Sequence, residues 1–272
     1  FLPIIGAFLE AFGVILEKKI LKNRRMNYKN YTVYSFFAIV LVMSLFVYFV
    51  WNVENEAFLL KNLLIFAFII IVSIFANLFI FYSLKRENIS EFEPAWLMQP
   101  LFTVLLAVLF FQSERNWMIV ILALIASSSL VISHIRRHHL YFNKYLLAAL
   151  IGSFLFAVEL VASKLILEFY SPFSLYYIRS FFILAITALI YRPKFREVDK
   201  KTGIVILLIG LMWALYRAII YYAYGTIRIV FTTVIFILSP VLMLIFAVIF
   251  LKERPNRRQI VSTLIILACV IV

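Results

Sequence analysis

Long apolar runs alternate with short polar segments along the whole chain. A helix needs about 20 apolar residues to cross the roughly 30 Å hydrocarbon core of a bilayer. Ten runs reach or approach that length, at roughly residues 1–17, 32–51, 62–84, 89–111, 117–134, 145–167, 171–191, 203–224, 227–251 and 258–272. Because unpaired backbone groups cannot face lipid, this pattern predicts an all-α integral membrane protein with ten transmembrane helices in one bundle.

Composition supports lipid as the solvent. The chain is 65% hydrophobic and 14% charged, whereas soluble domains average about 45–50% apolar and about 25% charged. The net charge of +13 does not indicate nucleic acid, because nearly all Lys and Arg lie between apolar runs, as in membrane loops. The run 1–17 lacks a preceding basic region and a cleavage site, so we expect a truncated first span rather than a signal peptide.

An internal repeat organises the chain. Residues 5–21 (IGAFLEAFGVILEKKIL) and 151–167 (IGSFLFAVELVASKLIL) are identical at eight of seventeen positions, at an offset of 146. Later matches keep the same order: Ser35-Phe36-Phe37 with Ser180-Phe181-Phe182, Pro100 with Pro240, Ala107-Val108 with Ala247-Val248, and Glu114-Arg115 with Glu253-Arg254. The matches predict a five-helix repeat at 1–134, a basic linker at 135–144 and a second repeat at 145–272.

Loop charges predict that the two repeats have opposite orientations. Five spans in each repeat force the second to enter the membrane upside down, so equivalent loops should carry opposite Lys/Arg bias. The loop after span 1 has six basic residues and its equivalent has one. The loops after spans 2 and 4 have one each, against five and four in their equivalents, and the pair after span 3 differs only slightly. We therefore expect two inverted-topology repeats.

The chain resembles the drug/metabolite transporter superfamily, specifically its EamA-type ten-helix members. The resemblance is carried by Gln99-Pro100 to Glu114-Arg115, by Ser239-Pro240 to Glu253-Arg254, and by aromatic-rich turns at residues 81–85 and 221–224. It implies a secondary exporter or exchanger of a small metabolite such as an amino acid, working by alternating access around a central cavity without a cofactor. Nothing in the sequence sets the oligomeric state.

Two orientations in the plasma (inner) membrane remain open. Odd-numbered loops carry 20 Lys/Arg and even-numbered loops about four, which places both termini outside. The family resemblance implies that both termini are cytoplasmic.

Acidic residues mark one face of the first helix and of its equivalent. Gly6, Glu10, Gly13 and Glu17 form a helical stripe, and Glu159 lies on the matching stripe of the sixth helix. Buried charges usually face a cavity, so Glu10 and Glu159, the deepest acids, are candidates for substrate binding or proton coupling. Burial favours a neutral carboxyl group unless a cation offsets it. The alternative is close helix packing with each Glu paired locally.

Polar and aromatic residues on spans 3 and 8 extend the candidate site. Asn77 faces inward on span 3, and Trp213, Arg217 and Tyr221 share one face of span 8. A guanidinium group at mid-span requires an anion, which Glu159, Glu10 or a substrate carboxylate could supply. A permanent buried salt bridge is the alternative for Arg217. Arg179 is expected to be structural and to extend to the membrane interface.

Span 4 contributes further candidates. Glu93, Trp96 and Pro100 share a stripe, with Gln99 beside them, although Glu93 also fits a helix-capping box. Pro100 and Pro240 each remove a backbone hydrogen bond, so they are candidate hinges, with simple packing variation as the alternative.

The sequence contains no motif that indicates an enzyme or a metal site. No zinc-protease, nucleophile-elbow, Walker A or dinucleotide motif is present, so we expect no enzyme activity and transport that is passive or driven by a gradient. His134 and His138 have metal-ligand spacing without a partner Cys or carboxylate, and we expect no metal site. A non-transporting receptor or assembly subunit is the alternative function. It would need a partner surface, which short loops do not offer.

Overall fold

The structure is a computed structural model that describes residues 2–23, 26–87, 92, 95–96, 98–134, 143–195, 198–239, 242, 261, 264–265 and 268. The longer helices are α1 (Leu2–Leu21), α2 (Tyr28–Ser44), α4 (Leu60–Arg86), α6 (Met98–Phe110), α7 (Trp117–His134), α8 (Lys144–Lys164), α9 (Pro172–Tyr191), α10 (Lys200–Thr226) and α11 (Ile229–Phe236). Shorter elements are α3 (Val47–Val50), η1 (Asn55–Phe58), η2 (Gln112–Glu114) and η3 (Leu167–Phe169).

The structure confirms the prediction of an all-helical protein with membrane-spanning helices. Each predicted run from 1–17 to 227–251 overlaps a described helix, whereas 258–272 lies mostly outside the described residues. In the part of the chain that is described, α4, α8, α9 and α10 are long and apolar enough to cross a bilayer. An isolated backbone bridge joins Val53 to Tyr170 in two connecting segments.

Polar caps explain where several helices begin. Asn143 precedes α8, and its side-chain oxygen accepts hydrogen bonds from the backbone N–H groups of Tyr145 and Leu146 at 2.9 and 2.7 Å. Asp199 caps α10 in the same way through Thr202, whose hydrogen bonds lower the pKa of the Asp199 carboxyl group. Such contacts satisfy donors that a helix leaves unpaired at its first turn.

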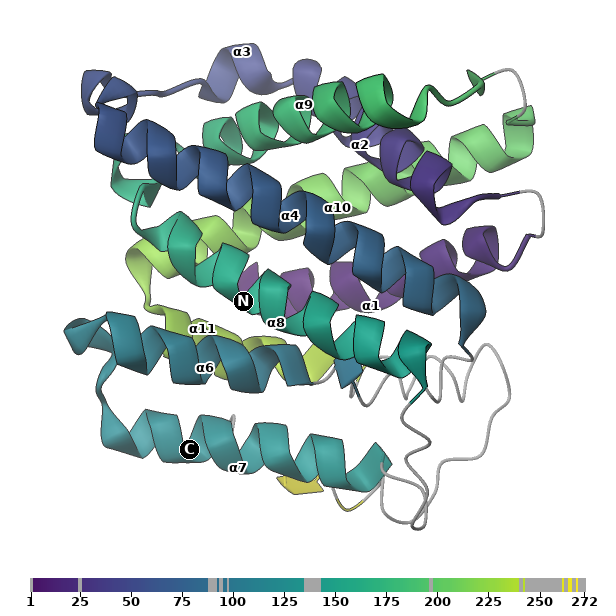
Figure 1. The fold of residues 1–272 in the computed structure, drawn as a ribbon. Coiled ribbons are helices and arrows are strands. Elements are labelled where there is room, and N and C mark those ends of the chain that lie inside the picture. The colour runs from purple at the N-terminus through teal and green to yellow at the C-terminus, as the bar shows by residue number, and fades with distance from the viewer. Residues whose placement is uncertain are drawn as a thin grey trace.

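Corresponding helices of the two halves run in opposite directions (Figure 1). Lys18, near the end of α1, donates to the carbonyl of Leu84 at the end of α4 at 2.6 Å. Asn143, at the start of α8, donates to the carboxylate of Glu87 just after α4 at 2.7 Å. Therefore α1 ends on the side of the bundle where its counterpart α8 begins.

Helix packing has the same symmetry. The bundle pairs α4 with α8, and it pairs their counterparts α10 and α1 with each other. The pairs α2 with α9 and α6 with α11 each join a helix to its own counterpart. Exchanging the two halves therefore reproduces these four pairs, and the centre of the bundle is built from both halves.

Gly210 brings α10 against the backbone of α2. A Cβ atom at this position would lie 2.8 Å from the Ala38 carbonyl carbon and 2.9 Å from the Ile39 nitrogen. We expect Gly210→Ala to separate the two helices and lower the free energy of unfolding by about 1–3 kcal/mol. Gly203→Ala is the matched control on the same helix, because no atom lies within 4 Å of its Cβ position. Equal unfolding temperatures for the two variants in detergent would contradict this packing.

Candidate functional site

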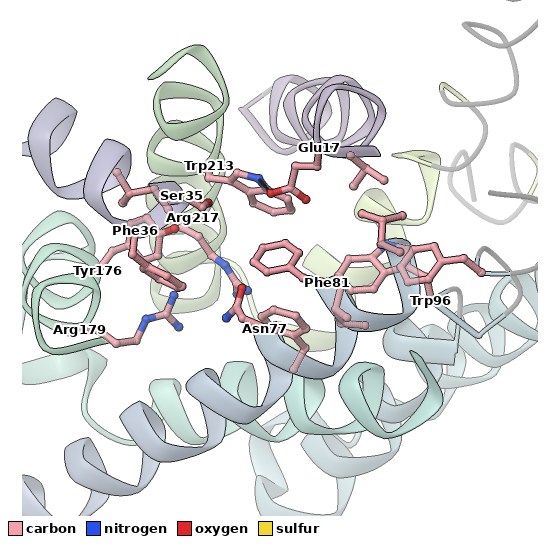
Figure 2. Close-up of a pocket in the computed structure, with 16 residues that line it drawn as sticks. Glu17, Ser35, Phe36, Asn77, Phe81, Trp96, Tyr176, Arg179, Trp213 and Arg217 are labelled. Carbon is pink, nitrogen blue, oxygen red and sulfur yellow. Dashed lines mark hydrogen bonds between the residues drawn. The ribbon is translucent and has the colours of Figure 1, made fainter. Parts of the chain in front are cut away.

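A cavity lies at the centre of the bundle, where α1, α2, α4, α8, α9 and α10 meet (Figure 2). We call it the first cavity. Its polar lining consists of Glu17, Ser35, Asn77, Arg179 and Arg217. Most of the remaining lining is aromatic or aliphatic, including Phe36, Phe81, Phe92, Trp96, Phe156, Tyr176 and Trp213. A mostly apolar cavity with a few convergent polar groups is typical of a small-molecule site.

A buried ion cluster borders this cavity and consists of Glu159, Arg179, Arg217 and Tyr221. Glu159 on α8 forms an ion pair with Arg179 on α9, and its second oxygen lies 3.1 Å from Nη1 of Arg217 on α10. The hydroxyl of Tyr221 donates to Glu159 at 2.7 Å. Glu159 is completely buried, and the two guanidinium groups exceed its single negative charge by one. The cluster therefore carries a net positive charge.

Aromatic rings hold both guanidinium groups in place. The Arg179 guanidinium lies 4.8 Å from the ring centre of Tyr176, and that of Arg217 lies 5.3 Å from the ring centre of Phe156. A cation over an aromatic face is attracted by the ring, more strongly where water is excluded. The two rings and the two arginine side chains come from α8, α9 and α10, so the site depends on the packing of these three helices.

Glu17 provides a separate carboxyl group on the same cavity, away from Arg179 (Figure 2). It is 2% exposed and accepts hydrogen bonds from Nε1 of Trp213 at 2.9 Å and from the hydroxyl of Tyr31 at 3.2 Å. Among the described residues, no Lys or Arg lies within 4.0 Å of this carboxyl group. Both of its hydrogen-bond donors are neutral, which distinguishes it from Glu159.

A second cavity is lined by Glu10. Its polar lining also includes Gln99, Thr103, Tyr216, Tyr224, Thr233 and Ser239, and Pro100 lies beside them. Trp96 borders both cavities. Glu10 and Glu17, two turns apart on α1, therefore face different spaces on either side of Trp96.

The comparisons agree with this architecture. The model of the EamA-like transporter family matches residues 1–134 and 143–272. The chain belongs to the EamA-like transporter family. Membership confirms the resemblance seen in the sequence and supports a transport role for a multi-pass membrane protein. No curated protein matches the chain.

A solved crystal structure, described only as that of a protein, is similar to this EamA-like chain. The two are 15% identical, with a TM-score of 0.72 over 97% of this chain and 95% of the other. At that identity the similarity shows a shared fold and no more.

The structure distributes the candidate residues over three neighbouring places. Asn77, Trp213 and Arg217 line the first cavity, Glu10, Gln99 and Pro100 line the second, and Trp96 lines both. Glu159 and Tyr221 lie in the ion cluster and line neither cavity. Glu93 and Pro240 lie outside the described residues.

Two expectations from the sequence need correction. Arg179 does not extend to the interface; it is 2% exposed and pairs with Glu159, because α9 turns it toward a carboxylate on α8. Glu17 lies on the predicted stripe of the first helix, but the sequence does not mark it as a site residue. The expected span ended at residue 17, whereas α1 continues to Leu21 and carries Glu17 into the bundle.

Glu114 joins three segments at one end of this EamA-like bundle. It accepts hydrogen bonds from Lys164 at 2.7 Å and from the backbone N–H groups of Ile229 and Val230 at 3.0 and 3.1 Å. A carboxylate at a helix N-terminus is stabilised by the unpaired N–H groups and the helix dipole. Glu114 thus anchors the start of α11 to α8 and to the connection after α6.

We expect Glu114→Ala to lower the free energy of unfolding by about 1.5–3 kcal/mol, because charged hydrogen bonds to buried donors are lost. Glu168→Ala is the control, since Glu168 is exposed on η3 at the same end of α8. Denaturant unfolding in detergent measures both variants. An equal midpoint for Glu114→Ala and Glu168→Ala would show that the Glu114 contacts contribute little.

Proposed function

We propose that this EamA-like protein is a secondary transporter that moves a small organic solute through the first cavity by alternating access. The observation that carries the proposal is the central cavity, which is lined by Arg179, Arg217 and Glu17. A purely structural salt bridge in a sealed core would not be expected to border a cavity. Here, instead, the two guanidinium groups line it.

The arrangement of the helices supports this mechanism. We propose ten transmembrane helices in two inverted five-helix repeats, consistent with the opposite directions of α1 and α8 and with the repeated packing pairs. Inverted repeats commonly place a solute site at the repeat interface, and rocking of one repeat opens it to either side. Pro100 borders the second cavity and is our proposed hinge, with Pro240 as its equivalent in the second repeat.

We propose that Glu17 binds the coupling proton, in place of Glu159. Two guanidinium groups stabilise the negative charge of Glu159, whereas Glu17 has only neutral donors. The titratable or charged groups around Glu17 are Tyr31 on α2 and, on the same cavity, Arg179 and Arg217. The neighbouring Lys18 is directed to the end of α4. Glu10, on the second cavity, is the other candidate.

We propose that the basic, odd-numbered loops face the cytoplasm, which places both termini outside the plasma membrane. Asn23 lies in the first of these loops and Asn55 in the second connection of the chain. An impermeant thiol reagent should label Asn55→Cys in intact cells and Asn23→Cys only after permeabilisation. The reverse pattern would support the cytoplasmic termini that the family resemblance implies.

A solute screen followed by flux measurement tests the transport function. Solutes that raise the melting temperature of the purified protein are loaded into proteoliposomes, and their movement is compared with that in protein-free liposomes. We expect at least one stabilising solute to be carried in a saturable manner. Stabilising solutes that are bound without any flux would favour the non-transporting receptor.

A further inference from the structure

The two guanidinium groups on the first cavity carry more hydrogen-bond donors than the neighbouring groups have acceptors for. Each guanidinium has five N–H donors and no acceptor. Arg179 donates to Glu159 and to the hydroxyl of Tyr221, the latter at 2.9 Å. Within the described residues, Nε of Arg179 is buried without a hydrogen-bond partner. Nη1 of Arg217 and Oε2 of Glu159 also lack one, but these two atoms lie 3.1 Å apart as an ion pair. An unpaired buried donor is costly, so the site favours a ligand that brings acceptors.

The charge of the ion cluster defines how much negative charge the ligand should bring. Two guanidinium groups face one carboxylate, which leaves one positive charge in a part of the bundle where both Arg side chains are at most 6% exposed. While Glu17 on the same cavity is protonated, a single negative charge on the ligand balances the cluster, whereas a dianion would reverse the imbalance. A carboxylate fits this requirement and matches the fork of a guanidinium group with two parallel hydrogen bonds.

The rest of the cavity fits an apolar group. Figure 2 places Asn77 beside the Arg217 guanidinium, with Phe81 and Trp96 farther along the same space. The Asn77 amide donates to the carbonyl of Ser73 at 2.8 Å, which fixes its orientation on α4. Aromatic walls beyond a charged end favour a flat, apolar body on the ligand.

From these observations we infer that the first cavity binds an organic monocarboxylate, with its carboxylate on Arg217 and Arg179 and an aromatic or apolar body against Phe81 and Trp96. This inference rests on the proposed function and names its substrate class. It differs from a zwitterion site because Glu17, the carboxyl group that lines the cavity among the described residues, already accepts hydrogen bonds from Tyr31 and Trp213. An ammonium group on the ligand is not required.

Calorimetric titration of the purified full chain tests the ligand chemistry. The probe is 3-phenylpropionate, compared with its neutral amide, with phenylethylamine, with phenylalanine and with phenyl phosphate. We expect 3-phenylpropionate to bind at least about tenfold more tightly than the amide, the amine and the phosphate, and no more weakly than phenylalanine. Phenylalanine binding more than about tenfold tighter would overturn the inference in favour of a zwitterion site. Failure of 3-phenylpropionate to bind at millimolar concentration would also overturn it.

Arg217→Gln provides the second arm of the test. The Glu159–Arg179 pair stays neutral as a unit in this variant, so the fold should persist while affinity for 3-phenylpropionate falls at least about tenfold. Arg86→Gln, an exposed residue at the end of α4, should leave that affinity unchanged. Equal affinity in both variants would overturn the inference. The comparison of acid with amide on the unaltered chain does not depend on either variant folding.

Flux separates this inference from the proposed function. Binding of 3-phenylpropionate without its movement across proteoliposomes would refute transport of that ligand and leave the binding inference standing. Movement of other solutes, with no binding of monocarboxylates, would refute the inference and leave the transport function standing.

Discussion

Glu159→Gln is expected to be the most destabilising single substitution in the bundle, with a loss of about 3–5 kcal/mol in the free energy of unfolding. The substitution leaves the buried guanidinium groups of Arg179 and Arg217 without their shared anion. Breaking a buried ion pair by removing one partner costs far more than the pair itself contributes, because the remaining charge is uncompensated. Denaturant unfolding in detergent measures the loss.

Two comparisons make this prediction specific. Arg217→Gln should be less destabilising than Glu159→Gln, because Glu159 and Arg179 remain paired. Glu168→Gln, at an exposed position shortly after α8, should have no measurable effect. A Glu159→Gln variant as stable as the unaltered chain would mean that the cluster is not a buried ionic unit.

Glu17→Gln is expected to reduce the response of solute flux to a pH gradient by about tenfold, within the usual range of coupling between two ligands. Glutamine keeps a side-chain oxygen for the hydrogen bonds from Tyr31 and Trp213, so the fold should be retained. It cannot exchange a proton, so solute exchange at equal pH should continue. Flux into proteoliposomes with and without a pH gradient measures the difference.

The same assay includes a control variant and an outcome that would contradict the prediction. Glu168→Gln should keep the full pH response, because its side chain is exposed and lines neither cavity. A Glu17→Gln variant with an undiminished response would transfer the coupling role to another carboxyl group. In that case Glu10, on the second cavity, would be the next residue to replace.

Sequence alone predicted the helices because their positions depend on apolar run length, which is a local property. It also predicted the inward faces of α1 and α8, because the repeat compares two copies of the same position. Asn77 and Arg217 were found in this way, and both line the first cavity. The anion for Arg217 could not be chosen from the sequence, since Glu10 and Glu159 are both deep and only the rotation of the helices separates them.

The partners of Arg179 could not be chosen from the sequence, for a related reason. Arg179 shares the buried face of α9 with Tyr176, Ser180 and Thr187, so a polar stripe does mark the inward side. Its partners are set by tertiary contacts with Glu159 and Tyr221, which lie 20 and 42 residues away in the sequence. Glu17 was overlooked because the apolar run ends there, although the helix does not.

Access to Asn77 from the two sides of the membrane tests the central claim without knowledge of the solute. In a background where the single cysteine, Cys269, is replaced by Ser, Asn77→Cys is reacted with an impermeant thiol reagent from either face of oriented proteoliposomes. Phe75→Cys, two residues earlier on the lipid-facing side of α4 and 52% exposed in the bundle, is the control. Alternating access predicts that Asn77→Cys reacts from both faces and Phe75→Cys from neither. Reaction of Asn77→Cys from one face only, or from neither, would contradict the account.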